Sequence, residues 1–132
     1  MIRRIQRQID DRHISNMTAI LGKDDDPMLP REAFDAILVS NTYHEFTQPK
    51  VMLQRICEAL KPSGALVVVE NYSIAHRTDS RADQAERHDM APETLERELS
   101  AAGFVVKERV EPVLVNSTDR LRYLVRAERQ PR

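Results

Sequence analysis

Two apolar runs that end in polar residues are the main pattern along this chain. The first runs from Phe34 to Asn41 and is followed by Thr42 to Phe46, and the second runs from Ala65 to Val69 and ends in Glu70-Asn71-Tyr72. Runs of this length suit strands that are buried on both faces. Because ligands bind beyond the carboxyl ends of the strands in open parallel sheets, the pattern predicts an enzyme-type cleft at these polar ends.

Helical spacing of apolar residues marks three other segments. It predicts a helix over residues 2–13, a helix that opens near Pro49, and a helix that begins at Pro92 and is capped by Gly103. Proline suits the first helical turn and glycine suits the carboxyl cap. Residues 73–90 are polar and mixed in charge, which predicts a surface loop with an irregular helix.

The remaining apolar segments predict strands. Residues 17–21 form a short apolar strand, and residues 104–111 pair with the alternating residues 120–126 across a loop that holds Pro112. The elements follow one another as a strand, a helix, a strand, a helix and a pair of strands. This order predicts an α/β fold. We expect a mostly parallel sheet with an antiparallel hairpin at its carboxyl-terminal edge, in one domain over residues 1–132.

Composition narrows the function classes. The 132 residues include 20 basic and 21 acidic side chains, for a net charge of −1, and this balance gives no field for nucleic acid or an anionic membrane. No apolar run is long enough to span a membrane. The single cysteine, Cys57, excludes an internal disulfide and a cysteine-based metal cluster, and it indicates a reducing compartment such as the cytoplasm.

Four segments follow one another at characteristic spacings. They are the acidic loop Lys23-Asp24-Asp25-Asp26-Pro27, the run from Phe34 to Asn41, the stretch from Leu60 to Glu70, and the segment from Glu96 to Phe104. Together, from about Asn16 to Arg126, they resemble the second half of the class I S-adenosylmethionine-dependent methyltransferases. The resemblance implies a Rossmann-like sheet, S-adenosylmethionine as cofactor, and methyl transfer to an acceptor.

The chain departs from this family in one respect. The family holds its cofactor on a glycine-rich loop after the first strand, whereas Gly22, Gly64 and Gly103 are too dispersed to form such a loop. We therefore expect an incomplete sheet, impaired cofactor binding, and Met1 as an internal methionine of a longer reading frame. Without the first strand, residues 34–41 would expose unpaired backbone groups, which predicts a homo-oligomer through that open edge.

His44 and Glu45 are the candidate catalytic residues. They directly follow the first long strand, and histidine is the side chain best suited to accept a proton near neutral pH. His44 can thus deprotonate a hydroxyl or amine of the acceptor. The alternative is that His44 is packed structurally or orders its loop through a hydrogen bond.

The candidate cofactor residues come from the resemblance. It implies that Asp24 and Asp25 contact the adenine or shape its loop, and that Asn41 and Thr42 lie beneath the sulfonium end. For Asp24 and Asp25 the alternative is a solvated acidic turn.

The candidate substrate residues are Glu70 and Tyr72, at the second strand end, and His88, in the irregular segment that resembles the family's substrate cover. The expected acceptor is a small molecule that the sequence does not name. No pair of potential ligands has a tight metal-binding spacing, so we expect no metal. The alternative function is a non-catalytic oligomerisation or interaction module that keeps the fold without the chemistry.

Overall fold

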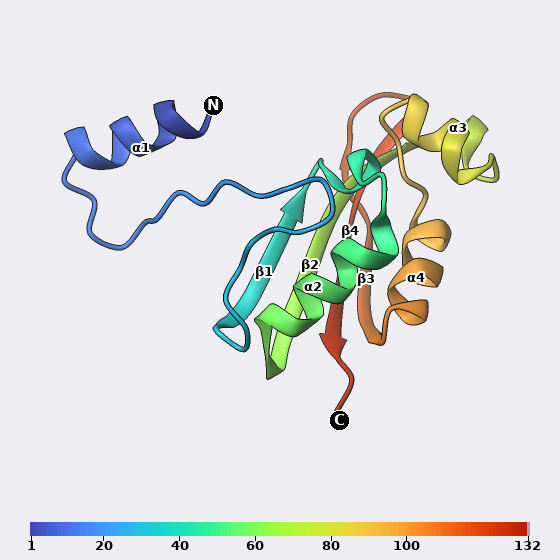
Figure 1. Ribbon diagram of the computed structural model, residues 1–132. Helices are drawn as coiled ribbons and strands as arrows, with labels where there is room; N and C mark the ends of the chain where they lie inside the picture. Colours follow the sequence, from blue (N-terminus) through green and yellow to red (C-terminus); the bar gives the residue numbers. More distant parts are fainter. Residues whose placement is uncertain (132) are drawn as a thin grey trace.

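A four-stranded mixed sheet forms the body of the computed structural model, which describes residues 1–131 (Figure 1). In the order β1-β2-β4-β3, the strands are β1 (Phe34–Ser40), β2 (Leu60–Ser73), β4 (Arg120–Arg129) and β3 (Phe104–Val115). β1 and β2 are parallel, and β4 runs antiparallel to both β2 and β3. Since β1, β2 and β3 share one direction, the predicted α/β sheet with an antiparallel carboxyl-terminal hairpin is confirmed.

The helices of residues 1–131 are α1 (Ile2–Asp11), α2 (Pro49–Ala59), α3 (Arg81–Glu86) and α4 (Pro92–Ala101), with short 3₁₀ turns η1 (Tyr43–Glu45) and η2 (Ile74–His76). Among these helices, α2 and α4 pack on one face of the sheet, and both lie in front of it in Figure 1. Gly103 follows α4 with a positive φ of 90°, as its predicted capping role requires. Within residues 1–131, none of the helices has the length and apolar character needed to cross a bilayer.

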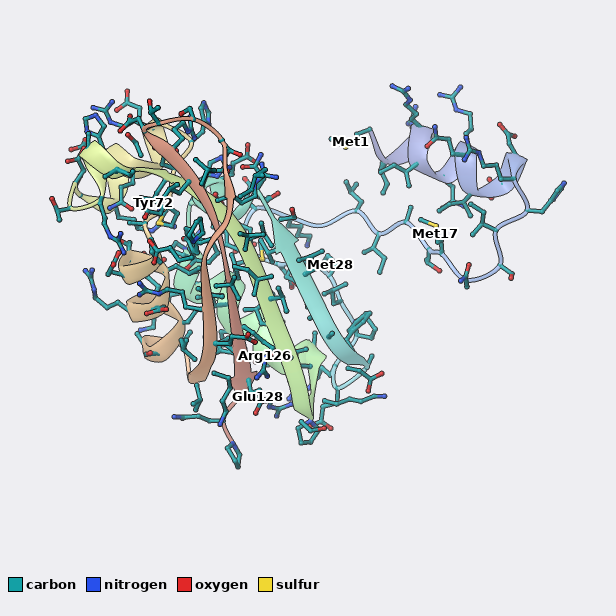
Figure 2. The ribbon with its side chains drawn as sticks, turned by 180° about the vertical axis from the view of Figure 1, so that it is seen from behind. Met1, Met17, Met28, Tyr72, Arg126 and Glu128 are labelled. Carbon is teal, nitrogen blue, oxygen red and sulfur yellow. The ribbon has the colours of Figure 1, made fainter. Side chains whose placement is uncertain are left out.

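Alternation along β2 builds the core. Leu66 and Val68 face the helices and are fully buried. Their neighbours in the core come from both helices and from β4: Leu53, Ile56, Leu95, Leu99, Tyr123 and Val125. On the back of the sheet, Val67 and Val69 are only half-buried, and Leu38 of β1 is 64% exposed. Figure 2, which views the molecule from behind, shows no helix covering this face.

The amino-terminal segment lies apart from the sheet. α1 and the extended chain after it project away from the body in both views (Figures 1 and 2). The predicted strand over residues 17–21 is wrong, because this segment forms no strand and exposes Met17 by 54% and Leu21 by 71%. A strand needs backbone partners, and no neighbouring strand within residues 1–131 supplies them here.

Two strands are longer than the sequence pattern predicted. β2 already begins at Leu60, which pairs with Phe34, and the register shifts before Ala36 pairs with Ala65, so the expected turn at residues 61–64 is an irregularity within the strand. β3 likewise continues to Val115, with a register shift between Val110 and Leu114. Pro112, predicted to lie in a loop, therefore lies in β3. An edge strand such as β3 tolerates proline, because one row of its N–H groups has no partner strand.

Candidate functional site

The carboxyl ends of β1 and β2 lie together at one edge of the sheet. The backbone N–H of Asn41, just after β1, donates to the carbonyl of Val69 in β2 at 2.8 Å. Beyond that point, alternation sends Glu70 and Tyr72 to the helix-covered face and Asn71 to the back. The predicted polar ends thus meet, but they divide into two groups on opposite faces of the sheet.

His44 and Glu70 form a buried pair on the helix-covered face. Oε1 of Glu70 accepts the backbone N–H of His44 at 3.0 Å and lies 2.9 Å from its Nδ1. Glu70 is fully buried and His44 is 6% exposed. The substrate contact expected of Glu70 therefore does not fit its position, because its carboxylate is enclosed and already occupied by His44. Two contacts to one oxygen hold both the backbone and the ring of His44.

The other ring nitrogen of His44 is left open. No group within residues 1–131 bonds Nε2, and none of the described buried side-chain N or O atoms lacks a partner. Nε2 must therefore reach the solvent. With Nδ1–H donating to the carboxylate, Nε2 carries the lone pair, which is the orientation a proton acceptor needs.

His88 and Asp89 lie beside His44. The His88 ring meets the His44 ring edge-on at 5.5 Å between centroids, and His88 is exposed. Asp89, which sequence reasoning missed, is buried, accepts the backbone N–H of Ser73 at 3.2 Å and pairs with Arg120. Burial raises the pKa of Asp89, against the opposing charge of Arg120. No periodic pattern marks Asp89, so no sequence signal would have found it.

His88 and Asp89 do not complete a metal site with the pair. In the described part of the chain, no group of three or more His, Cys, Asp or Glu side chains is placed to hold a metal ion.

Tyr72 belongs to a different network. Its hydroxyl donates to Glu111 of β3 and accepts from Nη1 of Arg77 at 2.9 Å, and its ring packs edge-on against Tyr123 at 5.9 Å. Burial, with the hydrogen bond to Glu111, raises the pKa of Tyr72 to about 12. Arg77 also donates from Nε to Glu93 of α4 at 3.0 Å. The structure therefore does not bring the Tyr72 hydroxyl together with His44.

A groove of about 550 Å³ lies between the loop at residues 20–29 and the elements β1 and α2. Leu29, Ile37 and Val39 contribute apolar walls, and Thr42 lines it at the carboxyl end of β1. Such walls suit the flat face of an aromatic base such as adenine. No carboxylate lines the groove, so its described residues offer no partner for a pair of ribose hydroxyls. The fit to S-adenosylmethionine covers the base and not the sugar.

The remaining candidates lie at the margins of this groove. The loop turns through a hydrogen bond from the Lys23 N–H to the Asp26 carbonyl at 2.6 Å, and neither Asp24 nor Asp25 lines the groove. Asp24 is exposed and Asp25 half-buried. Glu45 is exposed beside His44, and within residues 1–131 its side chain has no hydrogen-bond or ion-pair partner.

η1, which follows β1, and the start of α3 are attached to α4 and to each other by part-buried polar contacts. The hydroxyl of Tyr43 donates to Glu98, and Arg81 donates to the same carboxylate from Nε and to the carbonyl of Phe46 at 3.2 Å. Burial, with the bond to Glu98, raises the pKa of Tyr43. These contacts fix η1, and with it His44, against the covering segment.

Comparison with known proteins gives the family. The model of the family described as "Methyltransferase domain" matches residues 1–68. The chain belongs to this family and is part of a class I S-adenosylmethionine-dependent methyltransferase domain. Among curated proteins, no sequence matches it.

Solved structures share the fold at low identity. A SAM-dependent methyltransferase from Aquifex aeolicus has a TM-score of 0.75 and 17% identity, over 96% of this chain and 62% of that one. The [4+2]-cyclase SpnF has a TM-score of 0.74 and 16% identity, over 99% and 63%. A SAM-dependent methyltransferase from Methanosarcina mazei has a TM-score of 0.69 and 11% identity, over 99% of this chain and 78% of that one. The chain thus spans less than two thirds of the length of the first two. Since one is a cyclase, this fold alone does not fix a reaction.

Proposed function

We propose that this chain carries the acceptor side of a SAM-dependent methyltransferase that acts on a small molecule. The observation that carries the proposal is the His44–Glu70 pair, in which a buried carboxylate holds Nδ1 and leaves Nε2 open at the carboxyl edge of the sheet. Ligands of open α/β sheets bind at this edge. The net charge of −1 favours a small molecule over nucleic acid.

The chemistry divides between cofactor and protein. S-adenosylmethionine, when bound, supplies an electrophilic methyl group on a sulfonium. Nε2 of His44 accepts the proton of the acceptor's hydroxyl or amine, and Nδ1–H remains donated to Glu70. The charge of Glu70 then stabilises the imidazolium that forms.

Other candidates take supporting roles in this proposal. Asn41 and Thr42 contact the cofactor near its sulfonium end, and the loop with Asp24 and Asp25 borders its adenine. His88, beside the catalytic ring, contacts the acceptor. The single partial domain of residues 1–132 works in a reducing compartment, the cytoplasm, in keeping with its lone cysteine.

We expect weak cofactor binding by these 132 residues alone, because the groove offers no partner for the ribose hydroxyls. S-adenosylhomocysteine, titrated while ¹H–¹⁵N spectra are recorded, should shift the signals of Ser40, Thr42 and His44 only at millimolar concentrations. Absence of any shift there would contradict the cofactor site. Micromolar affinity would instead refute the impaired binding.

The proton-acceptor role has a test that needs no ligand. Imidazole ¹⁵N shifts should show neutral His44 protonated at Nδ1 and not at Nε2. Glu70→Gln, which removes the negative charge, should raise the share of the Nε2–H form, whereas Glu86→Gln on the exposed end of α3 should not. If the neutral wild-type ring is protonated at Nε2, His44 is ruled out as the proton acceptor.

The open edge of β1 favours a second candidate, a non-catalytic oligomerisation module. Within residues 1–131, β1 pairs only with β2, and Leu38 beside that edge is 64% exposed. A second copy that adds its own β1 would cover both features. Light scattering at micromolar concentration should then give a dimer or a larger species. A clean monomer would contradict this candidate and leave the methyltransferase proposal standing.

A further inference from the structure

Three asparagines and an arginine form a hydrogen-bonded chain across the back of the sheet's carboxyl edge. Nδ2 of Asn71 donates to Oδ1 of Asn41 at 2.9 Å. Oδ1 of Asn71 accepts from Nδ2 of Asn116 at 2.9 Å and from Nε of Arg122 at 3.0 Å. This row of hydrogen bonds therefore links the end of β1, the end of β2, the β3–β4 loop and the start of β4. None of the roles discussed above uses Asn71, Asn116 or Arg122.

Arg122 fixes the direction in which these hydrogen bonds are donated. An asparagine amide can present either its oxygen or its nitrogen to a neighbour, but a guanidinium only donates. The Asn71 atom that faces Arg122 must therefore be the oxygen, so its NH₂ group points at Asn41. The Asn41 atom that receives that bond must in turn be the oxygen. The NH₂ group of Asn41 is then the one directed away from the protein.

Asn41 is also held by its backbone. Its N–H bonds the Val69 carbonyl at 2.8 Å, and its φ is 51°, in the left-handed region that asparagine tolerates better than most residues. The residue is exposed, and within residues 1–131 no group accepts from its Nδ2. Its chain neighbours Ser40 and Thr42 line the groove beside β1. Asn41 thus presents two N–H donors at the edge of that groove without a protein partner.

We propose that Asn71 and Arg122 are positioning residues that fix the Asn41 amide as a hydrogen-bond donor toward the bound ligand. The ligand atom that Asn41 contacts is then an accepting oxygen, of the carboxylate class, and not a donor such as an ammonium or hydroxyl hydrogen. This inference rests on the proposed function, which places the ligand at this edge.

Asn71→Asp is the decisive variant. A carboxylate still accepts from Arg122 and Asn116 but has no hydrogen to give Asn41. The Asn41 amide should then turn, so that its NH₂ donates inward and its oxygen faces out. In side-chain ¹H–¹⁵N spectra, hydrogen exchange of the Asn41 NH₂ with water should slow roughly fivefold to tenfold, the factor expected of one gained hydrogen bond.

Asn116→Ala is the matched control, because it removes a donor to Asn71 while Arg122 still fixes the direction. It should leave the Asn41 signals as in the wild type. If Asn71→Asp does not fold, the double change Asn116→Ala with Arg122→Met serves instead. It removes both donors to Asn71 and should give two sets of Asn41 NH₂ signals. An Asn41 NH₂ that is already protected in the wild type, or unchanged in both test variants, would overturn the proposal.

A titration with S-adenosylhomocysteine separates this inference from the proposed function. Asn71→Asp should weaken whatever binding the wild type shows by about tenfold, since an oxygen would replace two donors at the ligand. A wild type that shows no shift at millimolar ligand counts against the methyltransferase proposal. The amide signals decide the positioning role in either case.

Discussion

The two ends of this chain carry similar apolar patterns and yet are stabilised very differently. In the carboxyl-terminal body, Leu53 of α2 and Leu99 of α4 are fully buried against the sheet. In the amino-terminal arm, which consists of α1 and the extended residues 12–21, Ile5 is 36% exposed and Leu21 is 71% exposed. An amphipathic pattern therefore specifies an element, but only a neighbouring element turns the pattern into burial.

Polar contacts show the same contrast. In the body they join segments far apart in sequence, as where Nη1 of the buried Arg129 donates to the Leu60 carbonyl at 2.6 Å. The side-chain bond within α1 is local, from Nε2 of Gln6 to Oδ1 of Asp10 at 3.0 Å. The body should thus unfold as a unit whose stability hardly depends on the arm.

The largest effect is expected from a cavity in the body. Leu99→Ala should lower the free energy of unfolding by about 3 kcal/mol, because the fully buried side chain packs between α4 and the sheet. The matched change in the arm, Ile5→Ala, should cost less than about 0.5 kcal/mol. Urea unfolding followed by circular dichroism measures both. Equal losses would show that the arm is part of the cooperative unit.

A loss of stability is also expected at alkaline pH, and it too belongs to the body. All three tyrosines lie there, and burial raises the pKa of each above its ordinary value of 10.0, that of Tyr72 to about 12. Above pH 10 the unfolded chain therefore releases protons that the folded chain retains. Stability is fully present below pH 10 and should fall as the pH rises from there toward 12.

Tyrosinate absorbance recorded together with circular dichroism tests this dependence. The absorbance should appear only with the loss of folded structure. An absorbance rise with a midpoint of 10 in a still folded protein would contradict the burial of Tyr43, Tyr72 and Tyr123.

Among the substitutions, the next in size is the loss of one part-buried hydrogen bond. Tyr43→Phe removes the hydroxyl that donates to Glu98 and should cost about 1 kcal/mol. Lys61→Ala removes an exposed ion pair, in which Nζ lies 3.0 Å from Oδ1 of Asp35, and should cost less than about 0.5 kcal/mol. Thermal unfolding of the two variants side by side would show the difference. A larger loss for Lys61→Ala would reverse the expected ranking of the Tyr43–Glu98 hydrogen bond over the exposed ion pair.

The same contrast explains how far sequence reasoning reached. Local signals sufficed for β1, α2 and α4, where apolar period, proline at the first turn and Gly103 at the cap agreed. Residues 17–21 show the limit, because their apolar character has no partner strand to pair with. The extent of β2 and β3 was missed since register shifts let strands continue through Pro112 and the segment at residues 61–64.

The site was predictable to the same degree. The strand ends led to His44 and Asn41, but not to which of their side-chain atoms lack a protein partner within residues 1–131. The enclosure of Glu70 and the network around Tyr72 depend on Arg77 and Glu111, which are distant in sequence and carry no motif. Asn71 had a readable signal, since alternation places it opposite Glu70 and beside Asn41. What it bonds required the position of Arg122.

The smallest thermodynamic effect is expected from cutting the arm. Residues 12–21 form no helix or strand, and Met17 is 54% exposed, so a protease should cleave here first. The arginine at position 12 gives trypsin a site there. The fragment that remains should unfold within about 0.5 kcal/mol of the whole chain, because no side chain of α1, the buried Ile9 included, belongs to the core cluster of the body. Mass spectrometry of a brief digest identifies the cut, and urea unfolding of the purified fragment measures the change. First cleavage within β3 or β4, or a fragment that no longer folds, would mean that the arm packs on the body and that the two regions are one.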